Sequence, residues 1–206
     1  MKTKTEAKRQ AILDEATQAF RELGYEGTSM SEIRARVGGS KATLYNHFAS
    51  KDELFFEVIA RLCEDEFEAV LDSIDPKTAD VGQSLRHFGE RFLHFLYSPQ
   101  VRANRRLAIA GSGRNELGRL MYERGVQRGQ KLMSDFLRTA MTDGRLRQAD
   151  PDIATLHLYA LLESELMDRF LFQQLEDVSD DEIRVITRRA MAVFMVAYGP
   201  DSPLAT

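Results

Sequence analysis

The stretch TSMSEIRARVGGSKATLYNHFASK, residues 28–51, predicts two short helices joined by a tight turn and followed by the start of a third. Ser29 and Glu32 form an S-x-x-E capping box, which marks the start of the first helix. Gly38-Gly39 ends that helix, because glycine readily adopts the left-handed conformation of a C-terminal cap. Ser40 is placed to cap the second helix. This helix-turn-helix pattern spans about residues 29–48.

The second helix of the pair has two different faces. Leu44 and Phe48 stand at i and i+4 and give one apolar face. The other face is small, polar and basic, and consists of Lys41, Ala42, Thr43, Tyr45, Asn46 and His47. Amide and hydroxyl groups read base edges, and Lys and Tyr hold phosphates, so this face suits a DNA groove. An ordinary helical hairpin with a solvated face has the same spacing and stays open as the alternative.

The identities of the residues in and around the hairpin are more informative than the helical spacing alone. The matching positions are Arg9, Ile12-Leu13, Phe20, Gly24-Tyr25, Thr28-Ser29-Met30, Ile33, SKATLYNHF and SKDELF. Over about the first sixty residues this string resembles the DNA-binding domain of the tetracycline-repressor (TetR) family. Two positions depart from the usual string: Gly39 stands where valine is common, and Ala42 where glycine is common. The expected DNA contacts are Thr28, Ser29, Ser40, Lys41, Ala42, Thr43, Tyr45, Asn46, His47 and Lys51.

The charge of the chain is unevenly distributed. The net charge of the 206 residues is -4, but residues 1–51 hold nine Lys and Arg against six Asp and Glu. The rest of the chain holds nineteen against twenty-six, so a basic N-terminal module precedes an acidic body. This asymmetry is typical of a protein in which only one end meets phosphate.

The composition favours a soluble chain. Its apolar runs are far too short to span a bilayer, and no signal peptide is recognisable at the N-terminus. Cys63 is the single cysteine, which excludes an internal disulfide and fits a reducing compartment. We therefore expect a cytoplasmic protein without a membrane partner.

Helical periodicity continues to the C-terminus and predicts an all-α fold of about nine helices. We expect a DNA-binding domain at residues 1–50 and a connecting helix at residues 51–75. A C-terminal ligand-binding and dimerisation domain then covers residues 76–206. A long helix is expected over about residues 116–141, where Gly125 and Gly129 indicate a bend or a close helix contact.

An aromatic stripe lies on the helix expected at about residues 81–97. Phe88, Phe92 and Phe95 recur at i, i+4 and i+7, a pattern of plain core or of a cavity wall. The residues expected to line a ligand cavity are Phe88, Phe92, Phe95, Met121, Tyr122, Phe136 and Tyr159. His87, Glu90 and His94 share a neighbouring face but lack the spacing of a zinc helix, so we expect no metal and no cofactor.

The middle of the chain carries a second resemblance. Ser98-Pro99, RRLAIAGSGRNELGRLMYERG and DGRLRQADP resemble the C-terminal ligand-binding domain of the AefR-like branch of the same family. Arg102, Arg105 and Arg106 in this stretch fit either an anionic ligand or a solvated, ion-paired face.

The last two predicted helices are unusually apolar. The helix that Asp150-Pro151 begins is apolar over much of its circumference, which requires more than one packing partner. The helix that Ser179 and Glu182 begin has a regular apolar stripe. The residues expected at a homodimer interface are Leu158, Leu162, Ile186, Val193 and Phe194.

Together the residues and the two resemblances imply a DNA-binding transcription regulator that is not an enzyme. The expected protein is a repressor that binds a palindromic operator in double-stranded DNA as a homodimer. A small, largely apolar inducer would release it. The alternative is a regulator without a small-molecule inducer, controlled by a protein partner. A helical enzyme finds no support, because no nucleophile–base pair or cofactor loop is recognisable, and His47 has no carboxylate at helical spacing.

Overall fold

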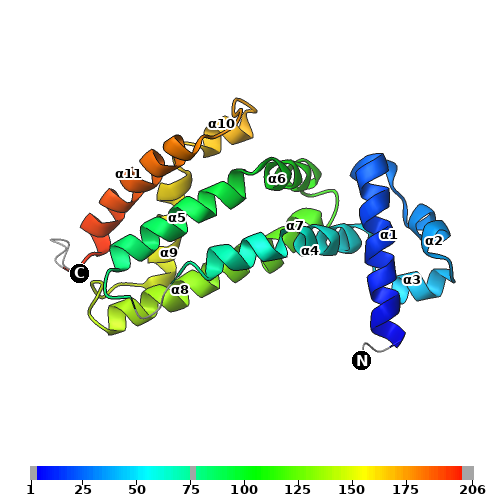
Figure 1. Ribbon diagram of the computed structural model, residues 1–206, viewed down its shortest axis with the longest axis horizontal. Helices are drawn as coiled ribbons and strands as arrows, with labels where there is room; N and C mark the ends of the chain where they lie inside the picture. Colours follow the sequence, from blue (N-terminus) through cyan, green and yellow to red (C-terminus); the bar gives the residue numbers. More distant parts are fainter. Residues whose placement is uncertain (1–3, 75–77, 201–206) are drawn as a thin grey trace. The chain divides into compact units, whose positions relative to one another are not determined.

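Helices make up the regular secondary structure of residues 4–74 and 78–200, which the computed structural model describes (Figure 1). The all-α prediction is confirmed. The elements are α1 (Lys4–Gly27), α2 (Met30–Val37), α3 (Lys41–His47), α4 (Lys51–Leu71), α5 (Val81–Tyr97), α6 (Pro99–Gly111), α7 (Leu117–Met121), the π-helix η1 (Tyr122–Val126), α8 (Gln127–Thr142), α9 (Pro151–Glu163), α10 (Met167–Leu171) and α11 (Asp180–Tyr198).

The described part of the chain has more helical segments than predicted, because the pattern at residues 116–141 is divided, and so is the helix predicted to begin at Asp150-Pro151, which becomes α9 and α10. The pattern at residues 116–141 becomes α7, η1 and α8, with Gly125 inside the π-helical turn. Glycine weakens the regular helix, and a single π turn is a common outcome at such a position. Gly129 faces α9, since a Cβ added there would lie 3.7 Å from the Tyr159 hydroxyl oxygen, an ordinary van der Waals distance.

The described residues form two compact units. Residues up to Glu64 and the segment Ala108–Tyr122 make up the first unit, and Asp65–Leu107 and the residues from Glu123 onward make up the second. The boundary predicted near residue 75 lies outside the described residues. The first unit includes a segment that the sequence pattern assigned to the C-terminal domain, because residues 108–122 contact the N-terminal helices.

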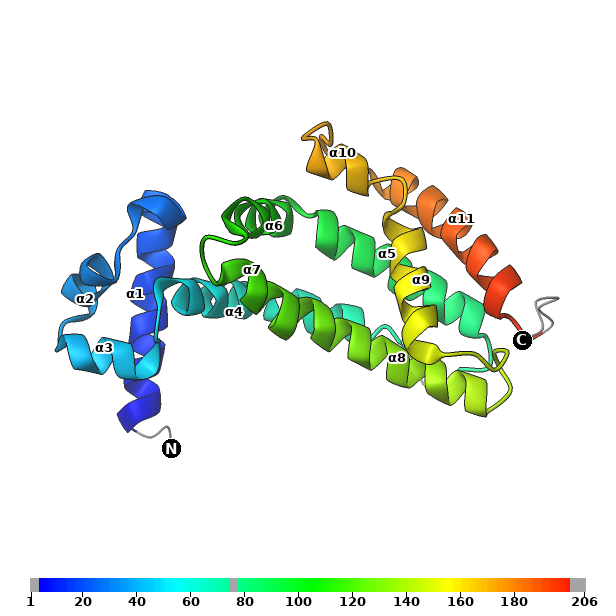
Figure 2. The same cartoon turned by 180° about the vertical axis from the view of Figure 1, so that it is seen from behind.

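In the first unit, α2 and α3 lie along the same side of α1 (Figures 1 and 2). Ile12, Ile33 and Leu54 are fully buried between these helices and α4. Gly24 interrupts α1, because its φ of 70° and ψ of 174° are not helical and make a kink, after which helical residues continue to Gly27.

The second unit is a helical bundle in which α11 packs on α5 and α9, and α9 packs on α8 (Figure 2). A Cβ added to Gly89 would lie 2.8 Å from Leu162 and 2.9 Å from Thr187, so glycine allows α5 to approach both neighbours closely. None of the described helices combines the length and the apolar character that crossing a bilayer requires.

Candidate nucleic-acid interface

The helix-turn-helix forms as its capping residues predict. The Ser29 hydroxyl accepts the backbone N–H of Glu32 at 3.1 Å and begins α2. The Ser40 hydroxyl accepts the N–H of Thr43 at 3.1 Å and begins α3. These two predicted N-caps are confirmed, and they fix where the two helices start on either side of the glycine turn.

The recognition helix α3 has one buried and one exposed face. Leu44 is buried, and so is Phe48 directly after the helix, which anchors α3 on the core of the first unit. The exposed positions are Lys41, Ala42, Tyr45 and Asn46. The face predicted to meet DNA is therefore the solvent face of a helix held in place from behind.

An open hollow of about 700 Å³ lies beside this face, between the start of α2, α3 and the start of α4. Five of the predicted contact residues line it, namely Thr28, Ser29, Lys41, Tyr45 and Lys51. The N-terminus of α2 at Ser29 and that of α4 at Lys51 both border the hollow, and backbone N–H groups at helix N-termini bind anions. The structure therefore brings together residues that are more than twenty positions apart in the chain.

Two groups of cations in this unit differ in their partners. The first group forms ion pairs that stabilise the fold: Arg9 with Glu57 at 2.6 Å, Arg61 with Asp14 at 2.7 Å, and Arg36 with Glu22 at 2.7 Å. The second group, Arg34, Lys41 and Lys51, lines the hollow and has no carboxylate partner among the described residues. Cations without a carboxylate partner are those available to phosphate.

Arg34 was not among the residues predicted from the sequence. It is exposed on α2 and borders the hollow together with Lys41. In the sequence, Arg34 could have been noticed because it follows Met30 by one helical turn. Arg36, two positions later, is also an arginine, but it forms ion pairs with Glu22 and Glu32. Only the folded structure shows which of the two arginines is ion-paired and which is available to DNA.

Lys51 has a defined place at the first turn of α4. Its ammonium donates a hydrogen bond to the backbone carbonyl of Tyr25 at 2.9 Å and lies 4.1 Å from the centre of the Tyr25 ring. The Tyr25 hydroxyl donates to Asp52, and burial and this carboxylate raise the pKa of Tyr25 above its ordinary value. The lysine is thereby oriented while two of its three N–H donors stay available.

Besides Lys51, three of the predicted contact residues are less than fully exposed. Thr28 is buried, and its hydroxyl donates to the carbonyl of Gly24 at 2.7 Å, so its side chain serves the fold. Thr43 is half-buried, with its hydroxyl 2.9 Å from that of Ser40. His47 is also half-buried, and its ring centre lies 6.5 Å from that of Phe48.

In the second unit, three predicted ligand residues form one aromatic cluster. The Phe92 ring centre lies 5.6 Å from that of Phe88 and 4.8 Å from that of Tyr159. Burial raises the pKa of the Tyr159 phenol. Tyr159 is partly buried, and its hydroxyl makes no hydrogen bond to another described residue.

The other four predicted ligand residues have no ring contact with this cluster. Phe95 packs on Phe67 with ring centres 5.8 Å apart, and Phe136 belongs to the buried core. Met121 and Tyr122 lie in the first unit, at the end of α7 and the start of η1. Five of the seven predicted ligand residues therefore lie in or against the core of the second unit, and two belong to the first.

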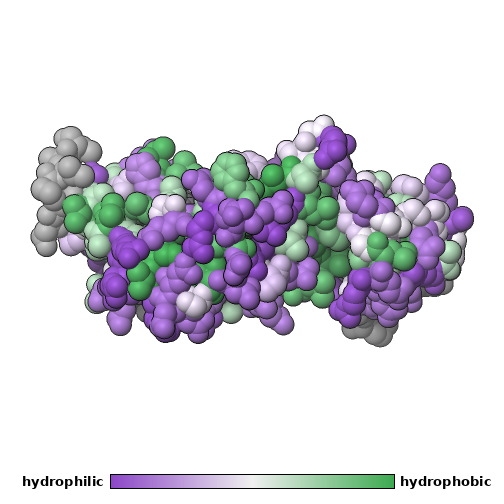
Figure 3. Space-filling view, turned by 90° about the horizontal axis from the view of Figure 1, so that it is seen from above, coloured by the Kyte–Doolittle hydropathy of each residue, from purple (hydrophilic) through white to green (hydrophobic). Residues whose placement is uncertain are grey.

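The predicted dimer residues divide sharply by exposure. Leu158, Leu162, Ile186 and Phe194 are at most 2% exposed, because they form the core between α5, α9 and α11. They offer no surface to a second copy of the chain. Val193 is 55% exposed and Val196 is 62% exposed on the outer side of α11, and hydrophobic side chains lie on the surface beside the end of that helix (Figure 3).

Two family models match the chain. The model described as "Bacterial regulatory proteins, tetR family" matches residues 12–58, and the model described as "AefR-like transcriptional repressor, C-terminal domain" matches residues 83–200. The second match alone covers more than half of the chain. The chain belongs to the TetR family of bacterial transcriptional regulators. The resemblances found in the sequence are confirmed, and the family is one of DNA-binding regulators rather than enzymes.

Solved structures and curated relatives agree with this membership. A TetR-family transcriptional regulator from Mesorhizobium loti is 28% identical, with a TM-score of 0.80, over 96% of this chain and 100% of that one. The flavonoid-responsive regulator FrrA is 29% identical, with a TM-score of 0.74, over 95% and 98% of the two chains. The HTH-type transcriptional regulator YhgD of Bacillus subtilis is 22% identical over 167 residues, which are 78% of this chain and 83% of that protein.

Proposed function

We propose that this TetR-family regulator is a repressor that binds a palindromic operator as a homodimer and is released by a small, largely apolar ligand. The observation that carries the DNA-binding part is the exposed face of α3 beside a hollow bordered by Arg34, Lys41 and Lys51, which lack carboxylate partners. The name of the C-terminal family model supports repression. The protein then acts in the cytoplasm, where bacterial DNA lies.

The proposed DNA contacts divide by type. Ala42 and Asn46 are exposed on α3, where a methyl group packs against thymine and an amide pairs with adenine. Ser29 and Lys51, at two helix N-termini beside the hollow, suit a backbone phosphate, and Arg34 joins them. The Thr28 side chain is left out of this set, because it is buried and bonded internally.

The proposed homodimer contact uses the outer faces of α9 and α11. Ile153 and Leu156 on α9, and Val193 and Val196 on α11, are large apolar side chains that are about half exposed or more. Grouped exposed apolar residues are typical of protein contacts. A two-fold dimer presents two recognition helices to successive major grooves, which a palindromic operator requires.

The proposed ligand site is the aromatic cluster of Phe88, Phe92 and Tyr159. Rings at these separations form a wall for a flat apolar ligand, and the Tyr159 hydroxyl supplies a polar contact that the described protein residues do not satisfy. FrrA, described as flavonoid-responsive, supports a ligand of the same kind, aromatic with hydroxyl groups. Binding that favours a DNA-incompetent state would release the operator.

The alternative is a regulator controlled by a protein partner without a small inducer. Binding of the purified protein to the DNA upstream of its own gene separates the two, with and without a panel of flavonoids and other lipophilic aromatic compounds. We expect DNA binding in all cases and release by at least one compound class. Tyr159→Phe should weaken that release and leave binding without ligand unchanged. Binding that no compound affects would favour the protein partner.

A further inference from the structure

The turn between α2 and α3 consists of two glycines with positive φ angles. Gly38 has a φ of 66° and Gly39 a φ of 119°, so two consecutive residues adopt values that L side chains rarely reach. Glycine has the widest choice of backbone conformations in the absence of other contacts. A turn of this kind needs a further contact if it is to hold α3 at one angle to α2.

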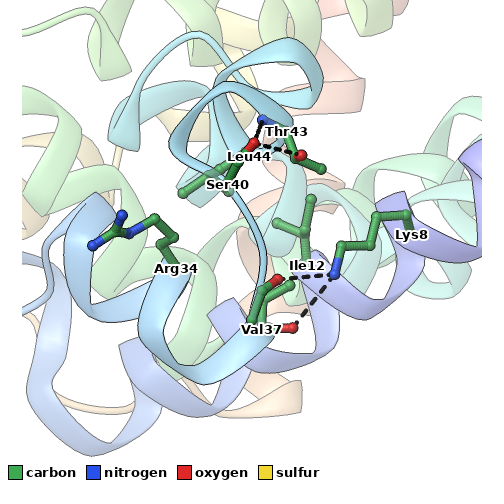
Figure 4. A pocket seen from close by; sticks show the side chains of 8 residues that line it. Lys8, Ile12, Arg34, Val37, Ser40, Thr43 and Leu44 are labelled. Atoms are coloured by element: carbon green, nitrogen blue, oxygen red, sulfur yellow. Dashed lines mark hydrogen bonds between the residues drawn. The ribbon is translucent and has the colours of Figure 1, made fainter.

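Lys8 supplies that contact from a distant part of the chain. Its ammonium donates a hydrogen bond to the carbonyl of Gly38 at 3.0 Å and approaches the carbonyl of Val37 at 3.4 Å (Figure 4). Val37 is the last residue of α2, and a lysine at a helix C-terminus satisfies free carbonyls and complements the helix dipole. Because Lys8 belongs to α1, it ties the turn to the supporting helix.

The surroundings of Lys8 show how closely α1, the turn and α3 meet. Lys8, Val37, Ser40 and Thr43 border one small hollow of about 10 Å³ (Figure 4). Such a space holds about one water molecule, which excludes a ligand site. Thr43 and Leu44 of α3 share this hollow with Lys8, so a displacement of the turn would shift the start of the recognition helix.

We propose that Lys8 is a positioning residue that fixes the recognition helix through the turn and so contributes to operator selectivity. Recognition of base edges requires several side chains of α3 to be placed together, whereas non-specific binding needs only cations near phosphates. Loss of Lys8 then weakens operator binding and leaves non-specific binding in place. This proposal rests on the DNA binding of the family and is independent of the proposed dimer face and ligand.

The test compares Lys8→Met with Arg21→Met on two duplexes across a salt series. One duplex is selected by the wild-type protein from fragmented DNA, and the other has the same composition in scrambled order. Arg21 is exposed on the same helix and has no described partner, so Arg21→Met removes one positive charge, as Lys8→Met does, without removing a contact. We expect Lys8→Met to weaken binding to the operator about 5- to 10-fold and binding to scrambled DNA less than about twofold. The salt slope should stay unchanged.

Two further measurements distinguish a positioning role of Lys8 from a phosphate contact. Lys8→Arg should retain most of the selectivity, because guanidinium also donates to carbonyls at a helix end. In Lys8→Met, the amide of Leu44, bonded to the Ser40 carbonyl, should exchange its hydrogen several-fold faster, with α1 amides unchanged. Equal weakening on both duplexes with a salt slope lower by about one per subunit would identify Lys8 as a phosphate contact. An unchanged selectivity ratio would also overturn the proposal.

Discussion

Asp52 and Glu116 are joined by a hydrogen bond across 64 positions of the chain. The Asp52 carboxylate accepts the backbone N–H of Glu116 at 2.9 Å and also accepts the hydroxyl of Tyr25. Glu116 directly precedes α7, within the part of the chain that the AefR-like C-terminal model matches. One carboxylate on α4 therefore holds a segment of the C-terminal sequence within the first unit.

The first prediction concerns this carboxylate. Asp52→Ala leaves the buried Tyr25 hydroxyl without its acceptor and frees the N–H of Glu116. We expect a loss of about 1–3 kcal/mol in the free energy of unfolding, measured with urea. Asp65→Ala is the control on the same helix, since Asp65 is exposed without a described partner and should change stability by less than about 0.5 kcal/mol. Equal effects of the two changes would contradict this role for Asp52.

The elements that local signals specify could be predicted from the sequence. Ser29, Ser40 and Ser179 cap the helices that their spacing indicated, and each accepts a backbone N–H three residues later. The recognition face of α3 followed from its lack of acids and its apolar Leu44. Capping and periodicity act over one or two helical turns, so the sequence contains all that they require.

The contacts between distant segments could not be predicted in this way. Periodicity shows that α9 and α11 are apolar, but it does not show which apolar residues face the protomer's own core. Phe194 is buried and its neighbour Val193 is exposed, although both are apolar and adjacent. Residues 108–122 return to the first unit, where Glu116 bonds to Asp52, and nothing in the sequence pattern pairs these two residues.

The second prediction uses that pair of neighbours on α11. Val193→Asp places a charge on the outer face proposed to meet a second copy, so we expect monomers in light scattering with little loss of monomer stability. Phe194→Ala instead removes a core ring and should destabilise the fold by about 3–5 kcal/mol. A Val193→Asp chain that stays dimeric at micromolar concentration would exclude this face.

The third prediction concerns the ion pair between Arg105 and Glu163 in the second unit. Both side chains are 16% exposed and their nearest N and O atoms lie 2.9 Å apart. The Tyr97 hydroxyl donates to the same carboxylate oxygen at 2.8 Å, and burial together with Glu163 raises the pKa of Tyr97. Of the two interpretations of the nearby arginines, this pair favours the ion-paired one for Arg105.

Glu163→Gln should therefore destabilise the chain by about 2–4 kcal/mol, because it leaves the Arg105 guanidinium buried without a counter-charge. The double change Arg105→Met with Glu163→Leu should recover most of that loss, since neither buried charge remains. Urea unfolding of Arg105→Met, of Glu163→Leu and of the double variant gives the coupling. Additive losses would show that the two side chains contribute independently.

The fourth prediction separates base contacts from phosphate contacts at the proposed DNA interface. Asn46 is exposed on α3 and its amide suits adenine, so Asn46→Ala should weaken the operator by about 1–3 kcal/mol and change which base is preferred. Lys51 lies beside the hollow and forms no ion pair with a described carboxylate. Lys51→Ala should weaken operator and scrambled DNA alike and lower the salt slope by about one per subunit.

Lys51→Ala also removes the hydrogen bond to the Tyr25 carbonyl, so its thermal stability must be measured beside its DNA binding. The matched control is Lys131→Ala, an exposed lysine of α8 in the second unit, whose ammonium lies 3.5 Å from Asp135. Its loss should leave both duplexes unaffected, because the second unit carries none of the proposed DNA contacts. If Asn46→Ala weakened both duplexes equally, or if Lys51→Ala left the salt slope unchanged, α3 and the hollow beside it would not face the DNA as proposed. Selective loss in the first variant and general loss in the second would place base recognition on α3 and phosphate binding at the start of α4.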